Sequence, residues 1–177
     1  SGLEEMDSTQ ESDVEQEEEK SEMPSAPQGN ILEREADLQE AWKHSDGAGI
    51  TVALLDTGVD TSHPDLAGHM LTGYDFINGR EEVYDAGLGM EQAHGTHMAG
   101  IIAQSAPGAQ ILPLKVFEYG NAYTSDILDA IAFAQEQGAS VVNMSFGCTD
   151  NNQALRQAME ESEMFFVCAA GNHRKDL

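Results

Sequence analysis

The hydrophobic positions along the chain form two kinds of segment that alternate from residue 31 onward. Nearly continuous apolar runs, such as residues 50–56, are typical of strands that are covered on both faces, as in parallel sheets. Segments with apolar residues three and four positions apart, such as 125–137, are typical of amphipathic helices. The pattern therefore predicts helices at 31–43, 94–104, 125–137 and 152–163, and strands at 50–56, 109–117, 141–145 and 164–170.

This alternation predicts how the elements are arranged in space. Strands that alternate with helices imply right-handed crossover connections and one parallel sheet between helical layers. We therefore expect an α/β fold with three layers, in which a mostly parallel sheet has helices on both faces. Pro113 lies inside the strand expected at 109–117 and has no backbone N–H to donate, so it predicts an edge strand or a bulge. Ser125 is the expected N-cap of the helix that follows.

The first 29 residues are predicted to be a disordered acidic tail and linker. Ten acidic residues and a single base, Lys20, lie between Ser1 and Met23. Such a segment buries too little apolar surface to offset the entropy of ordering it. Residues 23–29 contain the proline, glycine and serine typical of a linker. The expected organisation is a tail and linker over 1–29 and one folded unit over 30–177.

Charge and cysteine content narrow the range of partners and compartments. The 177 residues include 8 basic and 32 acidic side chains, a formal net charge of −24. Nucleic acids and anionic membranes are bound by basic surfaces, so we expect neither as a partner. No apolar run approaches the length of a membrane span, and no signal peptide is recognisable. Cys148 and Cys168 allow one disulfide or two free thiols. Because they lie isolated in apolar segments, buried free thiols and a reducing, cytoplasmic location are favoured. Secretion stays an alternative, because the sequence starts without methionine.

Polar residues suited to catalysis follow elements that this fold would bring to one rim of the sheet. Asp56 ends the first strand, His94 starts a helix and Asn172 follows the last strand. Gly95 and the small residues after it let the helix begin against neighbouring backbone, with His94 at its open end. A buried acid can orient an imidazole, the imidazole can take a proton from a nucleophile, and an amide can bind a developing oxyanion. Taken alone, His94 could equally be a structural histidine.

Three short motifs resemble the signature segments of subtilisin-like serine proteases, and they occur in that family's order. They are Asp-Thr-Gly at 56–58, His-Gly-Thr-His-Met-Ala-Gly at 94–100 and Ala-Ala-Gly-Asn at 169–172. The stretches at 61–66 and 141–147 resemble the family too, so the match covers roughly residues 38 to 172. The resemblance implies a subtilisin-like fold and serine endopeptidase activity on peptide bonds through a Ser-His-Asp triad.

The resemblance also implies a role for each matching residue. Asp56 would orient the base, His94 would act as general base and then as general acid, and Asn172 would donate its side-chain amide to the oxyanion. The residues that would pair with the extended backbone of a peptide or protein substrate are Ser145, Phe146 and Gly147. The residues that would line the pocket for the side chain before the scissile bond are Ala169, Ala170 and Gly171.

The family's nucleophile lies on a Gly-Thr-Ser-Met-Ala-like segment beyond the oxyanion asparagine, and the printed sequence has no such segment. We therefore expect the serine on a carboxyl-terminal half, either a separate chain or a missing segment, without which the fold is incomplete. The main interpretation is a protease nicked or autoprocessed in a surface loop, and a continuation beyond Leu177 is the alternative. The alternative function is that of a catalytically inactive pseudoprotease, which would bind peptides or serve as a regulatory scaffold. A further alternative gives the acidic tail an inhibitory role.

We expect no cofactor and no metal ion. His97 lies on the same helix face as His94, but no His-Glu-x-x-His pattern accompanies the pair, so we interpret it as structural. Asp60 and Asp65 are interpreted as solvated loop acids rather than cation ligands. Thr57 stands where proteases that cut at paired basic residues typically have a second acid, so the resemblance argues against that branch of the family.

Overall fold

The computed structural model describes residues 31–84, 93–146 and 152–169, with side chains from Asp37 onward. Within these residues one parallel sheet has the strand order β2-β3-β1-β4-β5. The strands are β1 (Thr51–Asp56), β2 (Tyr74–Asp75), β3 (Gln110–Lys115), β4 (Val141–Met144) and β5 (Phe165–Cys168). The helices are α1 (Ile31–Trp42), α2 (His94–Ser105), α3 (Thr124–Glu136) and α4 (Gln153–Glu161), with a short 3₁₀ helix, η1, at Pro64–Leu66. The acidic tail lies outside the described residues.

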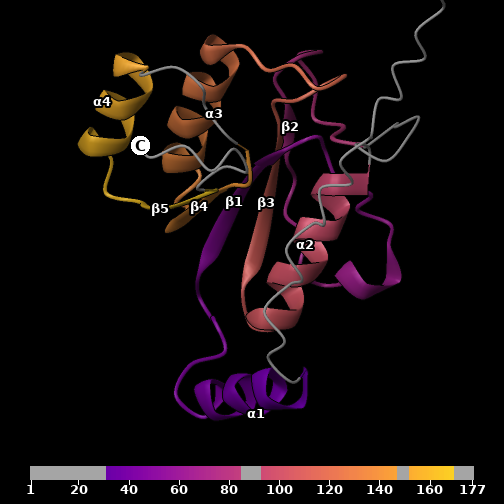
Figure 1. Cartoon of the computed structure of the whole chain (residues 1–177). Helices are drawn as coiled ribbons and strands as arrows, with labels where there is room; N and C mark the ends of the chain where they lie inside the picture. The colour runs from indigo at the N-terminus through magenta and orange to yellow at the C-terminus, as the bar shows by residue number, and fades with distance from the viewer. Residues whose placement is uncertain (1–30, 85–92, 147–151, 170–177) are drawn as a thin grey trace, which may run out of the picture.

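Helices cover both faces of the sheet, which confirms the expected α/β layers (Figure 1). One face is covered by α3 and α4, and the other by α2, whose small Ala99 and Ala103 pack against Leu54 and Ile111. In Figure 1, α1 lies below the amino end of β1, at the opposite end of the sheet from the start of α2. The indole nitrogen of Trp42 donates to the carbonyl of Ser105, which attaches α1 to the end of α2.

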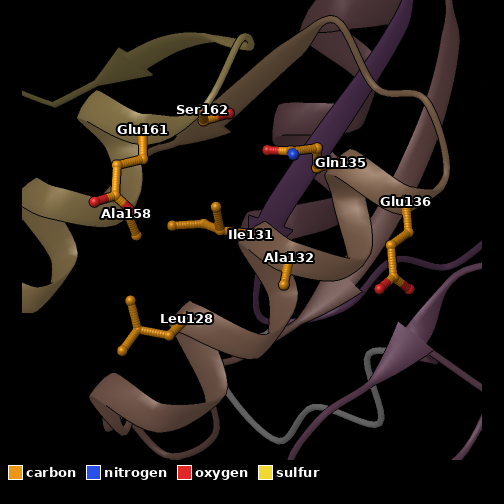
Figure 2. Close-up of a pocket in the computed structure, with 8 residues that line it drawn as sticks. All are labelled: Leu128, Ile131, Ala132, Gln135, Glu136, Ala158, Glu161 and Ser162. Atoms are coloured by element: carbon orange, nitrogen blue, oxygen red, sulfur yellow. The ribbon is translucent and has the colours of Figure 1, made fainter.

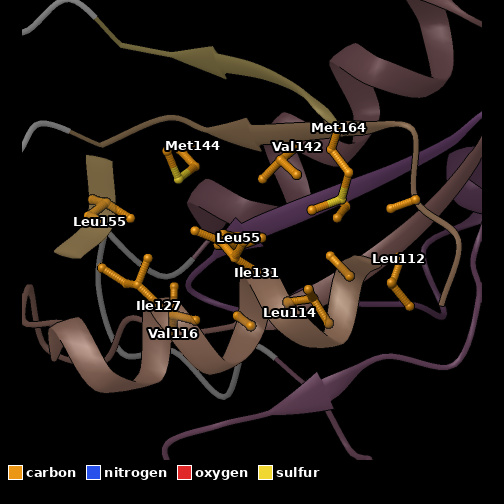
Figure 3. Close-up of a cluster of buried hydrophobic side chains, with 14 residues drawn as sticks. Leu55, Leu112, Leu114, Val116, Ile127, Ile131, Val142, Met144, Leu155 and Met164 are labelled. Carbon is orange, nitrogen blue, oxygen red and sulfur yellow. The ribbon is translucent and has the colours of Figure 1, made fainter. Parts of the chain in front are cut away.

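The larger core lies between the sheet and the α3–α4 layer (Figure 3). It forms because alternate residues along a strand point to the same face, so Leu55 and Val142 join Ile131 of α3. Phe165 and Val167 of β5 are 68% and 45% exposed, which makes the β5 edge the less covered part of the sheet. Among the described residues, no helix is both long and apolar enough to cross a membrane.

Pro113 does not lie at an edge or a bulge, contrary to the sequence-based prediction. It lies in β3, between β2 and β1, and its register with Leu54 of β1 is unbroken. The N–H of Ile111 points away from β1, to the carbonyl of His69, so by strand alternation the proline nitrogen also faces away from β1. On that side β2 pairs only with residues 114 and 115 of β3. The segment beside Pro113 is the one that contains Gly73, which lies close to the proline without belonging to β2. The proline is tolerated because it falls in this gap of the ladder.

Two other expectations need correction at the level of elements. The sequence pattern predicts no strand between the one at 50–56 and the helix at 94–104, but Tyr74–Asp75 forms β2, which is too short to show a hydrophobic pattern. Ser125 is not an N-cap, because α3 begins one residue earlier and Tyr123 occupies the cap position without a side-chain hydrogen bond.

Candidate active site

The carboxylate of Asp56 is fixed at the carboxyl end of β1. The apolar residues before it are buried in the central strand of the sheet. Asp56 continues this strand, so its side chain is also buried and is 3% exposed. Oδ1 accepts a hydrogen bond of 2.8 Å from the backbone N–H of Thr57. The carboxylate also lies at the amino end of α2, where the helix dipole favours negative charge.

His94 is the first residue of α2 and faces this carboxylate. Its Nδ1 lies 2.7 Å from Oδ1 of Asp56, while 42% of its side chain stays exposed. Because a carboxylate only accepts hydrogen bonds, the partner assigns the proton to Nδ1. In the neutral imidazole the other ring nitrogen, Nε2, is then an acceptor. The pair therefore has the geometry of an oriented base.

The start of α2 lies against the loop that follows Asp56, and this close approach depends on Gly95. A Cβ at Gly95 would lie 2.0 Å from the carbonyl oxygen of Gly58, so only glycine fits without a backbone shift. The N–H of Gly95 donates to Oγ1 of Thr57, and the N–H of Asp60 donates to Oγ1 of Thr96. These bonds hold His94 beside Asp56.

The residues expected at the substrate edge follow β4, so they lie at the same end of the parallel sheet as Asp56. Ser145 is half-buried, and its Oγ accepts a hydrogen bond of 2.8 Å from the side-chain amide of Asn143. The ring of Phe146 packs against Phe117, with 4.6 Å between their centroids. Ala169 follows β5 and is exposed, and its N–H donates to the carbonyl of Met144. Their binding of substrate stays a prediction.

The remaining predicted site residues are Gly147, Ala170, Gly171 and Asn172, and they lie outside the described residues. The oxyanion role of Asn172 is therefore a prediction from sequence.

Two buried charged residues near this site are not predicted by the sequence pattern. Asp75 and Lys115 are 0% and 4% exposed, at the ends of β2 and β3. The sequence does carry a signal for Lys115. It is a single charged residue at the end of an apolar strand, as Asp56 is at the end of β1. Asp75 gave no such signal, because β2 has only two residues.

Cys168 is exposed among the described residues, contrary to the expectation of a buried thiol. The apolar run suggested burial, but β5 is an edge strand and its outer surface is bare. Partial burial nevertheless raises the pKa of the Cys168 thiol above its ordinary value.

Asp60, interpreted from the sequence as a solvated loop acid, accepts hydrogen bonds from Ser62. Hydrogen bonds from the side chain and the backbone N–H of Ser62 hold the pKa of its carboxyl below the ordinary value. The described residues contain no group of His, Cys, Asp or Glu side chains placed to hold a metal ion.

A groove of about 460 Å³ lies between α3 and α4, on the face of the sheet away from α2 (Figure 2). Leu128, Ile131 and Ala158 point toward one another across it, and the rest of its lining is Ala132, Gln135, Glu136, Glu161 and Ser162. It lacks a histidine and a cysteine, so it offers no base or thiol nucleophile comparable to the Asp56–His94 pair.

Comparisons with known proteins show that residues 47–177 match the subtilase family. Thermitase of Thermoactinomyces vulgaris is 37% identical over 147 residues, which cover 75% of this chain and 51% of thermitase. The major intracellular serine protease of Bacillus subtilis (strain 168) is 36% identical over 148 residues, covering 75% of this chain and 46% of that protein.

Solved structures agree with these sequence relatives. A cold adapted subtilisin-like serine proteinase matches with a TM-score of 0.60 and 31% identity, over 72% of this chain and 48% of that one. Fervidolysin from Fervidobacterium pennivorans, described as a keratinolytic enzyme related to subtilisin, matches with a TM-score of 0.58 and 31% identity, over 76% and 23% of the two chains. This chain spans about half of thermitase and less of the other relatives. From its motifs, its parallel sheet and these matches together, the chain belongs to the subtilase family.

Proposed function

We propose that this chain is the amino-terminal part of a serine endopeptidase, in which Asp56 and His94 activate a serine carried on polypeptide outside the 177 residues. The observation that supports this most is the 2.7 Å hydrogen bond between the buried Asp56 carboxylate and the half-exposed imidazole of His94. It leaves Nε2 as an accessible proton acceptor at the rim where parallel strands end.

The chemistry follows from that orientation. Nε2 of His94 accepts the proton of the serine hydroxyl as the oxygen attacks the substrate carbonyl carbon. Asp56 stabilises the resulting imidazolium, which then protonates the leaving amine as the peptide C–N bond breaks and an acyl-enzyme forms. A water molecule, deprotonated by the same imidazole, releases the acid product and restores the serine.

The amide of Asn172 would stabilise the oxyanion in both steps. Loss of one such donor in subtilisin costs about 10²–10³ in kcat. The extended substrate backbone would pair with residues 145–147, because β4 itself is already paired on both sides by β1 and β5. The pocket for the residue before the scissile bond would be residues 169–171.

Reaction of the native protein with a fluorophosphonate probe tests this proposal. Fluorophosphonates phosphonylate only serines that a neighbouring base activates, so we expect one labelled serine, outside residues 1–177, identified by peptide mass spectrometry. His94→Ala should abolish labelling. The matched control is His97→Ala, because His97 lies on the same helix but is exposed.

The same sample distinguishes the alternatives. Intact mass and a denaturing gel show one continuous polypeptide or two associated chains, which separates an uncut protease from a nicked one. If the folded native protein takes no label, so that it does not differ from the His94→Ala variant, the peptidase proposal is contradicted and a peptide-binding scaffold is favoured.

A further inference from the structure

Among the described residues, the buried charged side chains form one row across neighbouring strands. They are Asp56, Asp75 and Lys115, which are 3%, 0% and 4% exposed. Lys115 of β3 is the register partner of Asp56 in β1 and also of Asp75 in β2. Register partners on parallel strands point to the same face of a sheet, with neighbouring strands about 4.8 Å apart. The row therefore places a cation between two anions on the face covered by α2, and its last member is the acid bonded to His94.

Lys115 is held in this row by two acids, Glu118 and Asp75. Its Nζ lies 3.2 Å from Oε1 of Glu118 and 4.0 Å from Oδ2 of Asp75. The carboxylate of Asp75 is itself fixed by the backbone N–H groups of Ile77 and Asn78, and by the side-chain amide of Asn78. These contacts compensate the cost of burying the lysine and fix the position of its charge.

One oxygen of the buried Asp56 carboxylate has no hydrogen-bond partner among the described residues. Its Oδ1 accepts from His94 and from Thr57, but Oδ2 is buried with no hydrogen-bond partner among the described residues. A buried anion with half of its acceptor capacity unused depends on nearby positive charge. Lys115 is the buried cation of the neighbouring strand, at the same level of the sheet.

We propose that Lys115 is a positioning residue, which keeps Asp56 ionised and favours the neutral, proton-accepting form of His94. A buried cation at the register position beside Asp56 stabilises the carboxylate and opposes a second positive charge on the imidazole. An apolar side chain would suit the strand interior equally well, so packing alone does not account for a lysine here. The inference rests on the proposed function, because it concerns His94 acting as a base.

Other charged or titratable groups surround the row and contribute to the same field. Arg80 follows β2, with Nε 3.7 Å from Asp75 and Nη1 4.0 Å from Glu82. Asp60 and His97 flank the start of α2, and Glu118 follows β3. None of these is buried like Lys115, so water screens them more strongly.

The test is the pH profile of fluorophosphonate labelling in the native protein, because it needs no known substrate. Lys115→Met should move the acid limb of the labelling rate to higher pH by about one unit, since a positive charge has been lost from the strand position next to Asp56, the partner of the base. Asp75→Asn should move it to lower pH by about half a unit, since an anion has been lost from the same row. Lys115→Arg should restore the unaltered profile.

Controls separate this role from a purely structural one. Lys43→Met is the matched control, because Lys43 also pairs with a glutamate, Glu40, but this pair is exposed at the end of α1. This substitution should leave the pH profile unchanged. Melting temperatures are recorded for every variant. Lower melting temperatures with an unmoved acid limb, or shifts of the same sign in Lys115→Met and Asp75→Asn, would overturn the proposal. An unaltered protein that takes no label contradicts the proposed function instead. If Lys115→Met does not fold, the direction of the Asp75→Asn shift still decides.

Discussion

Gly95 and Gly100 lie five residues apart in α2 and differ completely in the space around them. A Cβ at Gly95 would lie 2.0 Å from a backbone oxygen, whereas a Cβ at Gly100 meets nothing within 4 Å. Gly95 is therefore a requirement of the site, because it lets the helix that carries His94 approach the loop after Asp56. Gly100 is an ordinary helical glycine.

This contrast gives a matched pair of substitutions. Gly95→Ala should destabilise the native protein by about 1–3 kcal/mol, the usual cost of overpacking, and should displace His94 so that fluorophosphonate labelling falls at least about tenfold. Gly100→Ala should stabilise it by up to about 1 kcal/mol, because alanine is the better helix former. Thermal unfolding and labelling rates check both. Equal tolerance at the two positions would mean that α2 does not lie against Gly58.

The environment of Cys168 predicts whether its thiol reacts faster or slower than that of an ordinary cysteine. Partial burial raises the pKa of the thiol, so less of it is the reactive thiolate at neutral pH than in an unperturbed cysteine. We expect iodoacetamide to alkylate Cys168 more slowly at pH 7 than it alkylates a cysteine in an unstructured peptide. The rate should still be rising with pH above about 8.5, the ordinary thiol value. A rate that levels off below that pH would contradict this assignment.

The sequence was most informative where a residue's position follows from its own segment. Asp56 could be placed because it ends an apolar run, and His94 because a small-residue helix follows it. Lys115 and Asp75 could not be placed beside them, since their proximity depends on the register between three strands. Exposure of Cys168 was also beyond prediction, because it depends on β5 being the edge strand.

At the scale of elements, helices and strands with a clear period were predicted to within a few residues, and the exceptions are local. A strand of two residues has no period to detect, which is why β2 was missed. Pro113 was misinterpreted because the effect of a missing N–H depends on which side of the strand it faces. The cap of α3 was misplaced because Ser125 is the kind of residue that caps helices, although this helix starts without a side-chain cap.

The start of α4 shows a real side-chain cap and can be tested. Oδ1 of Asn152 accepts from the N–H of Leu155, and its Nδ2 donates to Oγ1 of Thr124 at the start of α3. Asn152→Ala should cost about 1–2 kcal/mol of stability, because both bonds are lost. Asn152→Asp keeps the acceptor and should lose less than half of that amount. Thermal or urea unfolding measures the difference, and equal losses in the two variants would show that capping is not what stabilises α4.

At the scale of the whole sequence, the 177 residues are strongly acidic, with a formal net charge of −24. Such a field should attract cationic substrates over long range, and salt should weaken the attraction. Under the proposed function, we expect kcat/KM of the native protein for a lysine-containing peptide to fall by about tenfold between roughly 10 mM and 500 mM salt. A neutral peptide of the same length is the control and should change little. Parallel salt dependence for both peptides would indicate that the charge has no role in substrate capture.

Asp56 and His94 are proposed to act together as the catalytic pair of a peptidase, and one substitution tests that directly. Asp56→Asn keeps the shape of the side chain but removes the charge that orients and stabilises the imidazole. In the native protein it should lower kcat for peptide hydrolysis by about 10⁴, the loss known for the equivalent change in a serine protease triad. Asp65→Asn, a change at an exposed acid of η1, should leave kcat unaltered. A kcat for Asp56→Asn within tenfold of the unaltered protein would contradict the assignment of this pair.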